Sequence, residues 1–315
     1  MKSGTANAVV IGEMLVDEFP SGPVMGGAPF NVARHLAAFG HRPLFVSAIG
    51  EDHNGQLLLA ELDRYGMSHA GVQRELAHPT GVVEVQMDAS GSHRFVIQQG
   101  CAWDHIEPAP ARAAVARTGG SSWLYAGTLA LRSPTSRATQ LALMREHKGP
   151  RFLDINWREG HVPREVAMEA VALANVLKAN EDELAMLCTW YGCAPPQSLE
   201  TEALSIAARE LRTGLGLDLL LVTLGVRGAM AVDANRVLHV GAARPVQVVD
   251  TVGAGDSFSA VALSGFMHGG ELGDILRYAC EFASRICEVR GAVPPGLDAY
   301  REWTSDWTWL GASRR

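Results

Sequence analysis

The stretch Leu219-Leu220-Leu221-Val222-Thr223 decides the fold class, because it is a continuous run of apolar residues closed by one threonine. A strand of this kind is typical of a parallel sheet that is covered on both faces, since no polar residue alternates with the apolar ones. The loop Leu224-Gly225-Val226-Arg227-Gly228 follows at once. Its two glycines suit a nucleotide lying across the carboxyl end of the strand, where open α/β sheets bind ligands.

Similar short apolar runs alternate with helical periodicity on both sides of this strand, which predicts a mainly parallel central sheet with helices on both faces. Residues 81–88 and 92–98 depart from this scheme, because they alternate apolar and polar residues with period two and residues 89–91 read as a hairpin turn. No low-complexity linker or internal repeat interrupts the chain. We therefore predict a single domain, residues 1–315, with a small accessory sheet. The other strands and helices are predicted at residues 7–11, 29–39, 44–49, 53–65, 123–125, 133–146, 152–155, 164–173, 176–177, 181–190, 202–212, 229–232, 237–240 and 254–288.

The composition excludes several classes of protein. Lys+Arg number 27 and Asp+Glu 34, so the formal charge is −7, which argues against nucleic-acid binding. The five cysteines are odd in number and scattered, which favours reduced thiols over a disulfide framework. The sequence has no signal-peptide pattern and no run of about 18 apolar residues that would cross a membrane. We expect a cytoplasmic protein without a membrane partner.

The stretch Asp250-Thr251-Val252-Gly253-Ala254-Gly255-Asp256-Ser257-Phe258 carries the clearest chemical signal. Its small residues precede a strongly apolar helix, so the N–H groups of Gly253, Ala254 and Gly255 are predicted to point outward. Such N–H groups and the helix dipole together bind an anion. Asp256 lies beside this anion site in the first helical turn, where its carboxylate would repel a phosphate unless it accepts a proton. Asp256 is therefore a candidate general base for a hydroxyl nucleophile, with a helix-favouring charge as the alternative.

A glycine pair stands before a second helix, in Met25-Gly26-Gly27-Ala28-Pro29-Phe30-Asn31. The pair permits close approach of a ligand to the backbone, and Asn31 presents an amide; a tight turn is the alternative interpretation. Asp17 follows the first strand. Its carboxylate would suit two vicinal sugar hydroxyls, with a solvated charge as the alternative.

Polar residues also follow two later strands, in Asp154-Ile155-Asn156-Trp157-Arg158 and Asn180-Glu181-Asp182-Glu183. Both stretches lie at the edge where open α/β sheets bind ligands. Acids at a helix start ordinarily favour the helix, which is our interpretation of Glu181 and Asp182. Glu183 is the candidate for magnesium, held through water because this ion keeps much of its hydration shell.

The chain has only three lysines, and none stands in the P-loop pattern Gly, four residues, Gly-Lys-Ser/Thr. A Walker-type nucleotidase is therefore excluded. We predict that the N–H groups of residues 253–255 and hydrated magnesium hold a phosphate, because no lysine is available in the phosphate loop.

Taken together and in this order, these stretches resemble the PfkB family of carbohydrate kinases. Residues 26–31 are similar to the family's N-terminal signature, and residues 250–258 are similar to its C-terminal signature. The resemblance extends over about residues 7–295, and residues 12–17, 27–31 and 154–158 are most similar to bacterial fructokinases. It implies a three-layer ribokinase-like fold with a small β-sheet lid, built from residues of about 13–25 and 80–100, and a homodimer as a further expectation.

The resemblance also implies roles for individual residues. Asp256 would deprotonate the sugar hydroxyl, and Gly253, Ala254 and Gly255 would form the anion hole for the γ-phosphate of ATP. Arg158 would lie near the transferred phosphate or near the far end of the sugar. The implied sugar ligands are Asp17, Gly27, Asn31 and Asn156.

The remaining implied roles concern the cofactors, which are ATP, Mg²⁺ and a monovalent cation such as K⁺. Glu183 would hold Mg²⁺ through water, and Asp250 and Thr251 resemble part of the monovalent-cation site. The implied nucleotide-binding residues are Asn180, Thr223, Gly225, Gly228, Ala279 and Ala283.

The leading hypothesis is an ATP-dependent sugar kinase that converts fructose to fructose 6-phosphate. A 2-keto-3-deoxygluconate kinase is the alternative, because Asp154, Asn156 and Arg158 would suit the carboxylate of a sugar acid. Ribokinase ranks lower, since Leu15 stands where ribokinases carry a polar residue. A catalytically silent sugar-binding regulator is the alternative from a different class, and such a protein would not need to keep Asp256 or Glu183. The Trp-rich residues 303–309 either cap the core or meet a partner.

Overall fold

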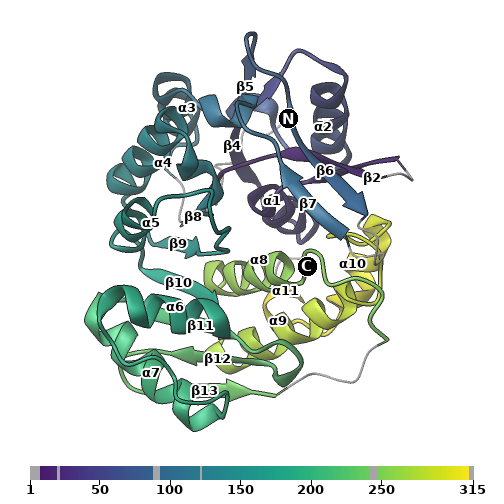
Figure 1. The fold of residues 1–315 in the computed structure, drawn as a ribbon. Helices are drawn as coiled ribbons and strands as arrows, with labels where there is room; N and C mark the ends of the chain where they lie inside the picture. The colour runs from purple at the N-terminus through teal and green to yellow at the C-terminus, as the bar shows by residue number, and fades with distance from the viewer. Residues whose placement is uncertain (1–7, 20–21, 88–92, 121–122, 242–246, 312–315) are drawn as a thin grey trace. The chain divides into compact units, whose positions relative to one another are not determined.

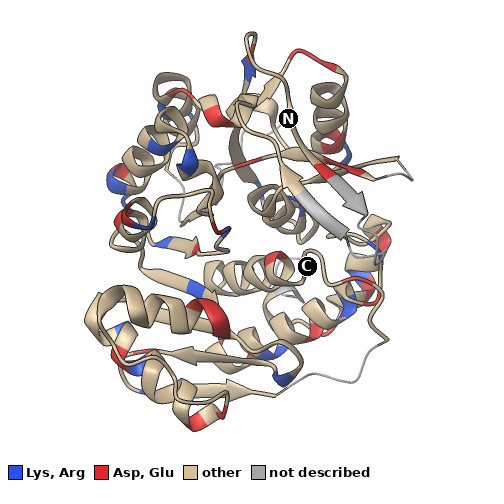
Figure 2. Ribbon diagram, viewed as in Figure 1, with Lys and Arg blue, Asp and Glu red and all other residues tan. Residues whose placement is uncertain are grey.

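The computed structural model describes residues 8–19, 22–87, 93–120, 123–241 and 247–311. The chain forms two compact units, Met1–Glu146 and His147–Arg315 (Figure 1). Acidic and basic residues are interspersed along the helices and strands of both units (Figure 2). Among the described residues, no helix is long and apolar enough to cross a membrane.

The first unit contains a parallel sheet whose central strands are wholly buried. Its strand order is β8 (Trp123–Ala126), β1 (Ala8–Ile11), β4 (Pro43–Gly50) and β5 (Val72–Glu75). Every residue of β1 and β4 is buried, which is the pattern of strands covered on both faces. The helices of this unit are α1 (Ala28–Ala38), α2 (His53–Arg64), α3 (Pro108–Ala116) and α4 (Pro134–Glu146).

A second, four-stranded sheet of the first unit confirms the predicted accessory sheet. Its order is β3 (Gly22–Gly26), β2 (Leu15–Phe19), β6 (Gly81–Met87) and β7 (His93–Ile97). The β2–β3 and β6–β7 pairs are antiparallel, and β2 pairs with β6 in parallel, with Leu15 opposite Gly81. The predicted turn at residues 89–91 lies outside the described residues.

The second unit carries the continuous apolar strand Leu219–Thr223. β9 (Arg151–Asp154), β10 (Val176–Asn180) and β11 (Leu219–Thr223) are parallel, and β12 (Ala229–Val232) and β13 (Val237–Val240) continue the sheet in antiparallel order. The first four residues of β11 are buried, as predicted. The helices are α5 (Arg164–Val171), α6 (Glu181–Tyr191), α7 (Thr201–Leu215), α8 (Ala254–Met267), α9 (Leu272–Ile286), α10 (Leu297–Trp303) and α11 (Thr308–Gly311).

The Trp-rich C-terminal segment packs on the second unit. Trp307 and Trp309 are 4% and 6% exposed, and the Trp309 ring lies 5.1 Å from the ring of Tyr278 on α9. The Trp307 ring lies 5.8 Å from that of Phe282 on the same helix. Aromatic pairs at these separations contribute packing energy beyond their buried area. Of the two interpretations offered above, the structure supports the one in which this segment caps the core.

Two elements of the first unit were absent from the sequence prediction. The strand β5 contains Gln73 and Arg74 and therefore lacks an apolar run. The helix α3 has the sequence PAPARAAVA, in which alanine and proline hide any helical periodicity. In the second unit, the predicted helical segment 254–288 is divided into α8 and α9, and α10 and α11 were not predicted. The boundaries of the other predicted elements differ from the observed ones by a few residues, because helix and strand ends depend on capping as well as on apolar spacing.

Candidate functional site

The C-terminal glycine motif forms the start of α8, in the second unit. Gly253 is the N-cap residue with φ +77°, a conformation that favours glycine. A Cβ atom at Gly253 would lie 2.4 Å from Cα of Ala292, so the close approach of residue 292 also requires glycine here. The Ala254 N–H donates to the Thr251 carbonyl at 3.3 Å, so this group is shared with the preceding turn.

Asp256 lies in the first turn of α8, as predicted, and only 9% of it is exposed. The next two turns of α8 are buried and include Ser257, Phe258 and Ser259. The helix therefore begins at an anion-binding end and carries an aspartate within one turn of it. An anion bound at this helix end would therefore lie within one turn of the Asp256 carboxylate.

A lysine lies directly against this loop, which corrects the prediction that none is available. Lys178 is on β10, and its Nζ atom would be 3.0 Å from a Cβ atom placed on Gly255. The Lys178 ammonium donates to Asp154 Oδ1 at 3.1 Å and to Oδ2 at 3.0 Å. Sequence reasoning missed Lys178 because it sought a lysine within a phosphate loop, whereas this one reaches the loop from a neighbouring strand. A lysine inside an otherwise apolar strand was the available signal.

The Asn180-Glu181-Asp182-Glu183 stretch caps α6, whose acidic start is visible in Figure 2. Asn180 Oδ1 accepts the Glu183 N–H at 2.8 Å, and Glu183 Oε2 accepts the Asn180 N–H at 2.8 Å, which is a capping box. Glu183 Oε1 accepts the Trp157 N–H at 2.7 Å. Burial raises the pKa of Glu183, and Lys178 opposes this effect. Because both oxygens already accept backbone N–H groups, the donor set fits an ion held through water better than direct coordination.

The stretch Asp154-Ile155-Asn156-Trp157-Arg158 separates into buried and exposed parts. Asp154 is 1% exposed, and its carboxylate accepts hydrogen bonds from Lys178 and Ser259 in the protein interior. Asn156 has φ +32°, outside the regions that most side chains prefer, and Arg158 is exposed. Asn156, which is partly buried, and Arg158 remain accessible to a ligand.

The predicted nucleotide-binding residues lie in the second unit and differ in how exposed they are. Gly225 is exposed with φ +56°, and Gly228 has φ +93° and no room for a side chain, since its Cβ would lie 2.0 Å from the Val240 carbonyl oxygen. Thr223 is partly buried at the end of β11. On α9, Ala279 is fully buried and Ala283 is partly buried.

The predicted monovalent-cation residues form the turn before α8. Asp250 Oδ1 accepts the Val252 N–H at 3.0 Å, and Asp250 Oδ2 accepts the Gly291 N–H at 3.0 Å. Thr251 is exposed. Among the described residues, no group of three or more His, Cys, Asp or Glu side chains is placed to hold a metal ion.

Three of the four predicted sugar ligands, Asp17, Gly27 and Asn31, lie in the first unit, whereas Asn156 belongs to the second unit. A Cβ atom on Gly26 would be 2.3 Å from Asp17 Oδ2, so the carboxylate of β2 packs against the glycine pair. Gly27 is the N-cap residue of α1 with φ +108°, and its Cβ would lie 2.6 Å from the Glu13 carbonyl oxygen. The glycine pair therefore makes room for the protein's own groups, whereas the sequence reading assigned that space to a ligand.

Arg34, on α1, organises this group of residues and was missed by the sequence reading. It is 2% exposed and donates to Glu61 at 2.9 Å, to the Met25 carbonyl at 2.9 Å and to Asn31 Oδ1. The bond to Asn31 Oδ1 fixes the orientation of that side-chain amide. The signal in the sequence was an arginine three residues after Asn31 on the apolar face of the helix.

Asp17 has a perturbed pKa. Burial raises the pKa of its carboxyl from 3.8 to about 6, and the positive charge of Arg34 opposes the rise. A carboxyl group whose pKa lies near neutral pH is typical of a functional site.

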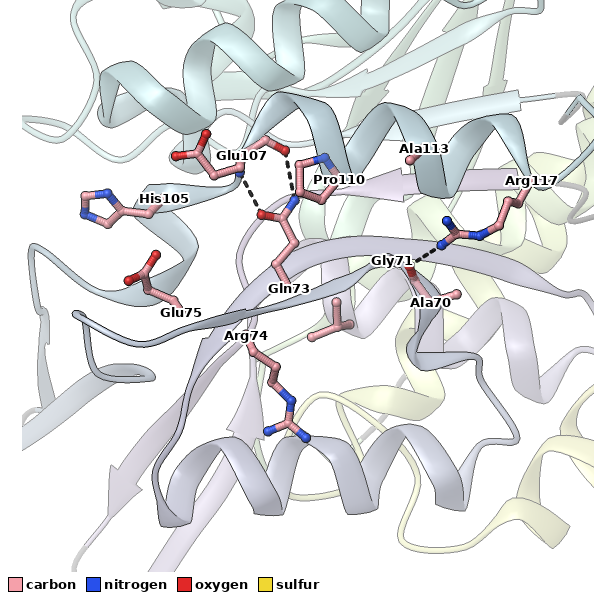
Figure 3. A pocket seen from close by; sticks show the side chains of 11 residues that line it. Ala70, Gly71, Gln73, Arg74, Glu75, His105, Glu107, Pro110, Ala113 and Arg117 are labelled. Atoms are coloured by element: carbon pink, nitrogen blue, oxygen red, sulfur yellow. Dashed lines mark hydrogen bonds between the residues drawn. The ribbon is translucent and has the colours of Figure 1, made fainter.

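A separate pocket of about 370 Å³ in the first unit lies between β5 and α3 (Figure 3). Its polar groups are bonded to one another: Gln73 pairs with the backbone of Glu107, and Arg117 donates to the Ala70 carbonyl. None of the predicted site residues lines it. We therefore assign it no part in the chemistry.

Comparison with known proteins shows the family of this chain. Residues 22–299 match the model of the pfkB family carbohydrate kinases. The chain belongs to this family. A fructokinase of Klebsiella pneumoniae is 30% identical over 272 residues, covering 81% of this chain and 83% of that protein.

Two solved structures confirm the predicted ribokinase-like fold. The fructokinase of Xylella fastidiosa with bound ATP is similar with a TM-score of 0.80 and 22% identity, covering 96% of this chain and 99% of that one. The ribokinase of Thermotoga maritima gives a TM-score of 0.76 and 21% identity, covering 95% and 99%. The protein is therefore a sugar kinase of the PfkB family with a mostly parallel central sheet and a small second sheet.

Proposed function

We propose that this PfkB-family kinase transfers the γ-phosphate of ATP to fructose and releases fructose 6-phosphate and ADP. One observation carries the chemistry: the buried carboxylate of Asp256 stands in the first turn of α8, next to the glycine loop of residues 253–255. The fructokinase similarity at 30% identity supports the choice of sugar. We place the reaction in the cytoplasm.

The protein contributes positioning and charge stabilisation to this reaction more than covalent chemistry. Asp256 accepts the proton of the sugar 6-hydroxyl as that oxygen attacks the γ-phosphorus, and the bond from the γ-phosphorus to the bridging oxygen breaks to leave ADP. The glycine-loop N–H groups stabilise the charge on the transferred phosphoryl group. Mg²⁺, bound through water near Glu183, would offset the charge of the ATP phosphates. A monovalent cation near Asp250 and Thr251 would reinforce the turn that presents the loop.

The first unit supplies the sugar ligands of the proposal. Asp17 accepts hydrogen bonds from sugar hydroxyls, and Asn31 donates or accepts in the orientation that Arg34 sets. Leu15 is 4% exposed, and its Cδ1 atom would lie 3.2 Å from a Cβ atom on Gly26. An apolar residue next to Asp17 favours fructose over ribose, for which ribokinases carry a polar residue at this position.

A screen of acceptors tests the substrate. ADP release from MgATP is measured with fructose, ribose, 2-keto-3-deoxygluconate and adenosine, and we expect fructose to give the highest kcat/KM. Preference for the sugar acid would replace fructose by 2-keto-3-deoxygluconate as the substrate. Binding of a sugar without any ADP release would identify a catalytically silent regulator instead.

The substitution Asp256→Asn tests the base. We expect it to preserve the binding of ATP and sugar and to lower kcat by about 10³-fold or more, since proton transfer and the associated charge are both lost. Asp182→Asn is the matched control, because Asp182 is also an acid in the first turn of a helix but is exposed. Near-normal turnover of Asp256→Asn would remove Asp256 from the role of base.

A further inference from the structure

Lys178 and Asp154 form a buried ion pair beneath the phosphate loop. Their side chains are 8% and 1% exposed, and the Lys178 ammonium bonds to both carboxylate oxygens of Asp154 at 3.1 and 3.0 Å. A buried charge pair is costly to remove from water and is weak support for stability by itself. Its presence here therefore calls for a reason other than stability.

The ion pair connects two strands to the first turns of α8. The Ser259 hydroxyl donates to Asp154 Oδ2 at 2.8 Å, and Lys178 Nζ lies against the backbone of Gly255. Ser259 follows Asp256 by three residues, so the two side chains lie on the same side of the helix. The contacts thus fix both the glycine loop and the helical face that carries Asp256.

Lys178 is also a positive charge among carboxylates. Burial lowers the pKa of Lys178, but attraction to Asp154, Glu183 and Asp256 outweighs burial, so the pKa lies above its ordinary value and the ammonium stays charged. Lys178 therefore places one positive charge among the acidic side chains of Asp154, Glu183 and Asp256. The carboxylates repel a triphosphate, and the Lys178 ammonium reduces this repulsion next to the glycine loop.

We propose that Lys178 is a positioning residue of the phosphate site, which holds the glycine loop and Asp256 in place and offsets the negative charge next to the transferred phosphate. Asp154 orients Lys178 by accepting hydrogen bonds from its ammonium at both carboxylate oxygens. The inference rests on the proposed kinase function and adds to it a cation that neither signature motif contains.

The variant Lys178→Met with Asp154→Asn separates this role from a structural one. Replacing Lys178 alone would leave the Asp154 carboxylate buried without its partner, whereas the double variant is neutral and keeps an oxygen that accepts the Ser259 hydroxyl. We expect it to fold, to bind ATP about tenfold more weakly in calorimetry and to lose about 100-fold in kcat, with the sugar KM within about twofold of wild type.

Two further variants complete the test. Lys178→Arg keeps the charge and should recover at least about tenfold of the lost kcat. Lys148→Met removes an exposed lysine of the same unit and is the matched control, expected to change neither ATP affinity nor kcat.

Three outcomes test the proposed role of Lys178. ATP affinity and kcat within threefold of wild type in the folded double variant overturn the proposal. If the double variant does not fold, Asp154→Asn alone is measured, because it keeps Lys178 but removes the carboxylate that orients it, and ATP affinity and kcat within threefold of wild type in that variant overturn the proposal. If the wild type binds ATP but phosphorylates no acceptor, the proposed function fails, and the loss of ATP affinity alone still decides the role of Lys178.

Discussion

The elevated pKa of Asp17 makes a quantitative prediction about sugar binding. With a pKa of about 6, the Asp17 carboxyl is almost fully ionised at pH 8, but only about one-tenth is ionised at pH 5. Hydroxyl groups donate to the ionised form, so we expect the fructose Kd to rise about tenfold from pH 8 to pH 5. At the ordinary aspartate pKa of 3.8, the same change in pH would alter the Kd by only about 10%.

Calorimetric titration with fructose in the absence of nucleotide isolates this effect, because Asp256 then takes no part in a reaction. Asp17→Asn should bind fructose weakly, with little dependence on pH between 5 and 8. A wild-type Kd that stays constant over this range would refute the assignment of Asp17 as the sugar-binding carboxylate, or its raised pKa.

Unfolding experiments distinguish these two explanations. The pKa of Asp17 is higher in the folded state than in the unfolded state, so the folded state binds more protons between about pH 3.8 and pH 6 and loses stability as the pH rises through that window. Asp17→Asn should then be more stable than wild type at pH 8 by at most about 3 kcal/mol, and the difference should vanish below about pH 4. A pH-independent difference would show that the pKa is not raised.

Two other predictions concern stability and are measured by urea unfolding. Gly253→Ala should lower the free energy of unfolding by about 2–4 kcal/mol, because it adds a clash with Ala292 to the cost of φ +77°. The control is Gly269→Ala, at φ +67° with open space around it, which should lower the free energy of unfolding by only about 1 kcal/mol. Equal losses in the two variants would exclude the clash. Trp307→Ala should lower the free energy of unfolding by about 3–5 kcal/mol, since the ring is 4% exposed and packs against the aromatic side chains of α9. Thr308→Ala, at an exposed position, is the control. A loss below about 1 kcal/mol for Trp307→Ala would contradict the capping role.

Much of the fold could be predicted because its signals are local. The apolar run of β11 and the hairpin of β12 and β13 were predicted with their observed boundaries. The start of α8 after Gly253 was also predicted, from the small residues that precede its apolar run. By contrast, β5 and α3 have no apolar periodicity and depend on contacts with the rest of the first unit.

The sequence by itself determined the order of strands and helices, the glycine loop and the positions of Asp17 and Asp256 along the chain. Tertiary structure alone decided that Lys178 reaches Gly255 and that Ser259 bonds to Asp154, across 105 positions of sequence. It also decided that Arg34 joins Asn31 to Glu61, 27 positions further along. Spacing rules compare residues within one helix or strand, whereas the charges that surround a phosphate or a sugar are set by elements that meet only when the chain is folded.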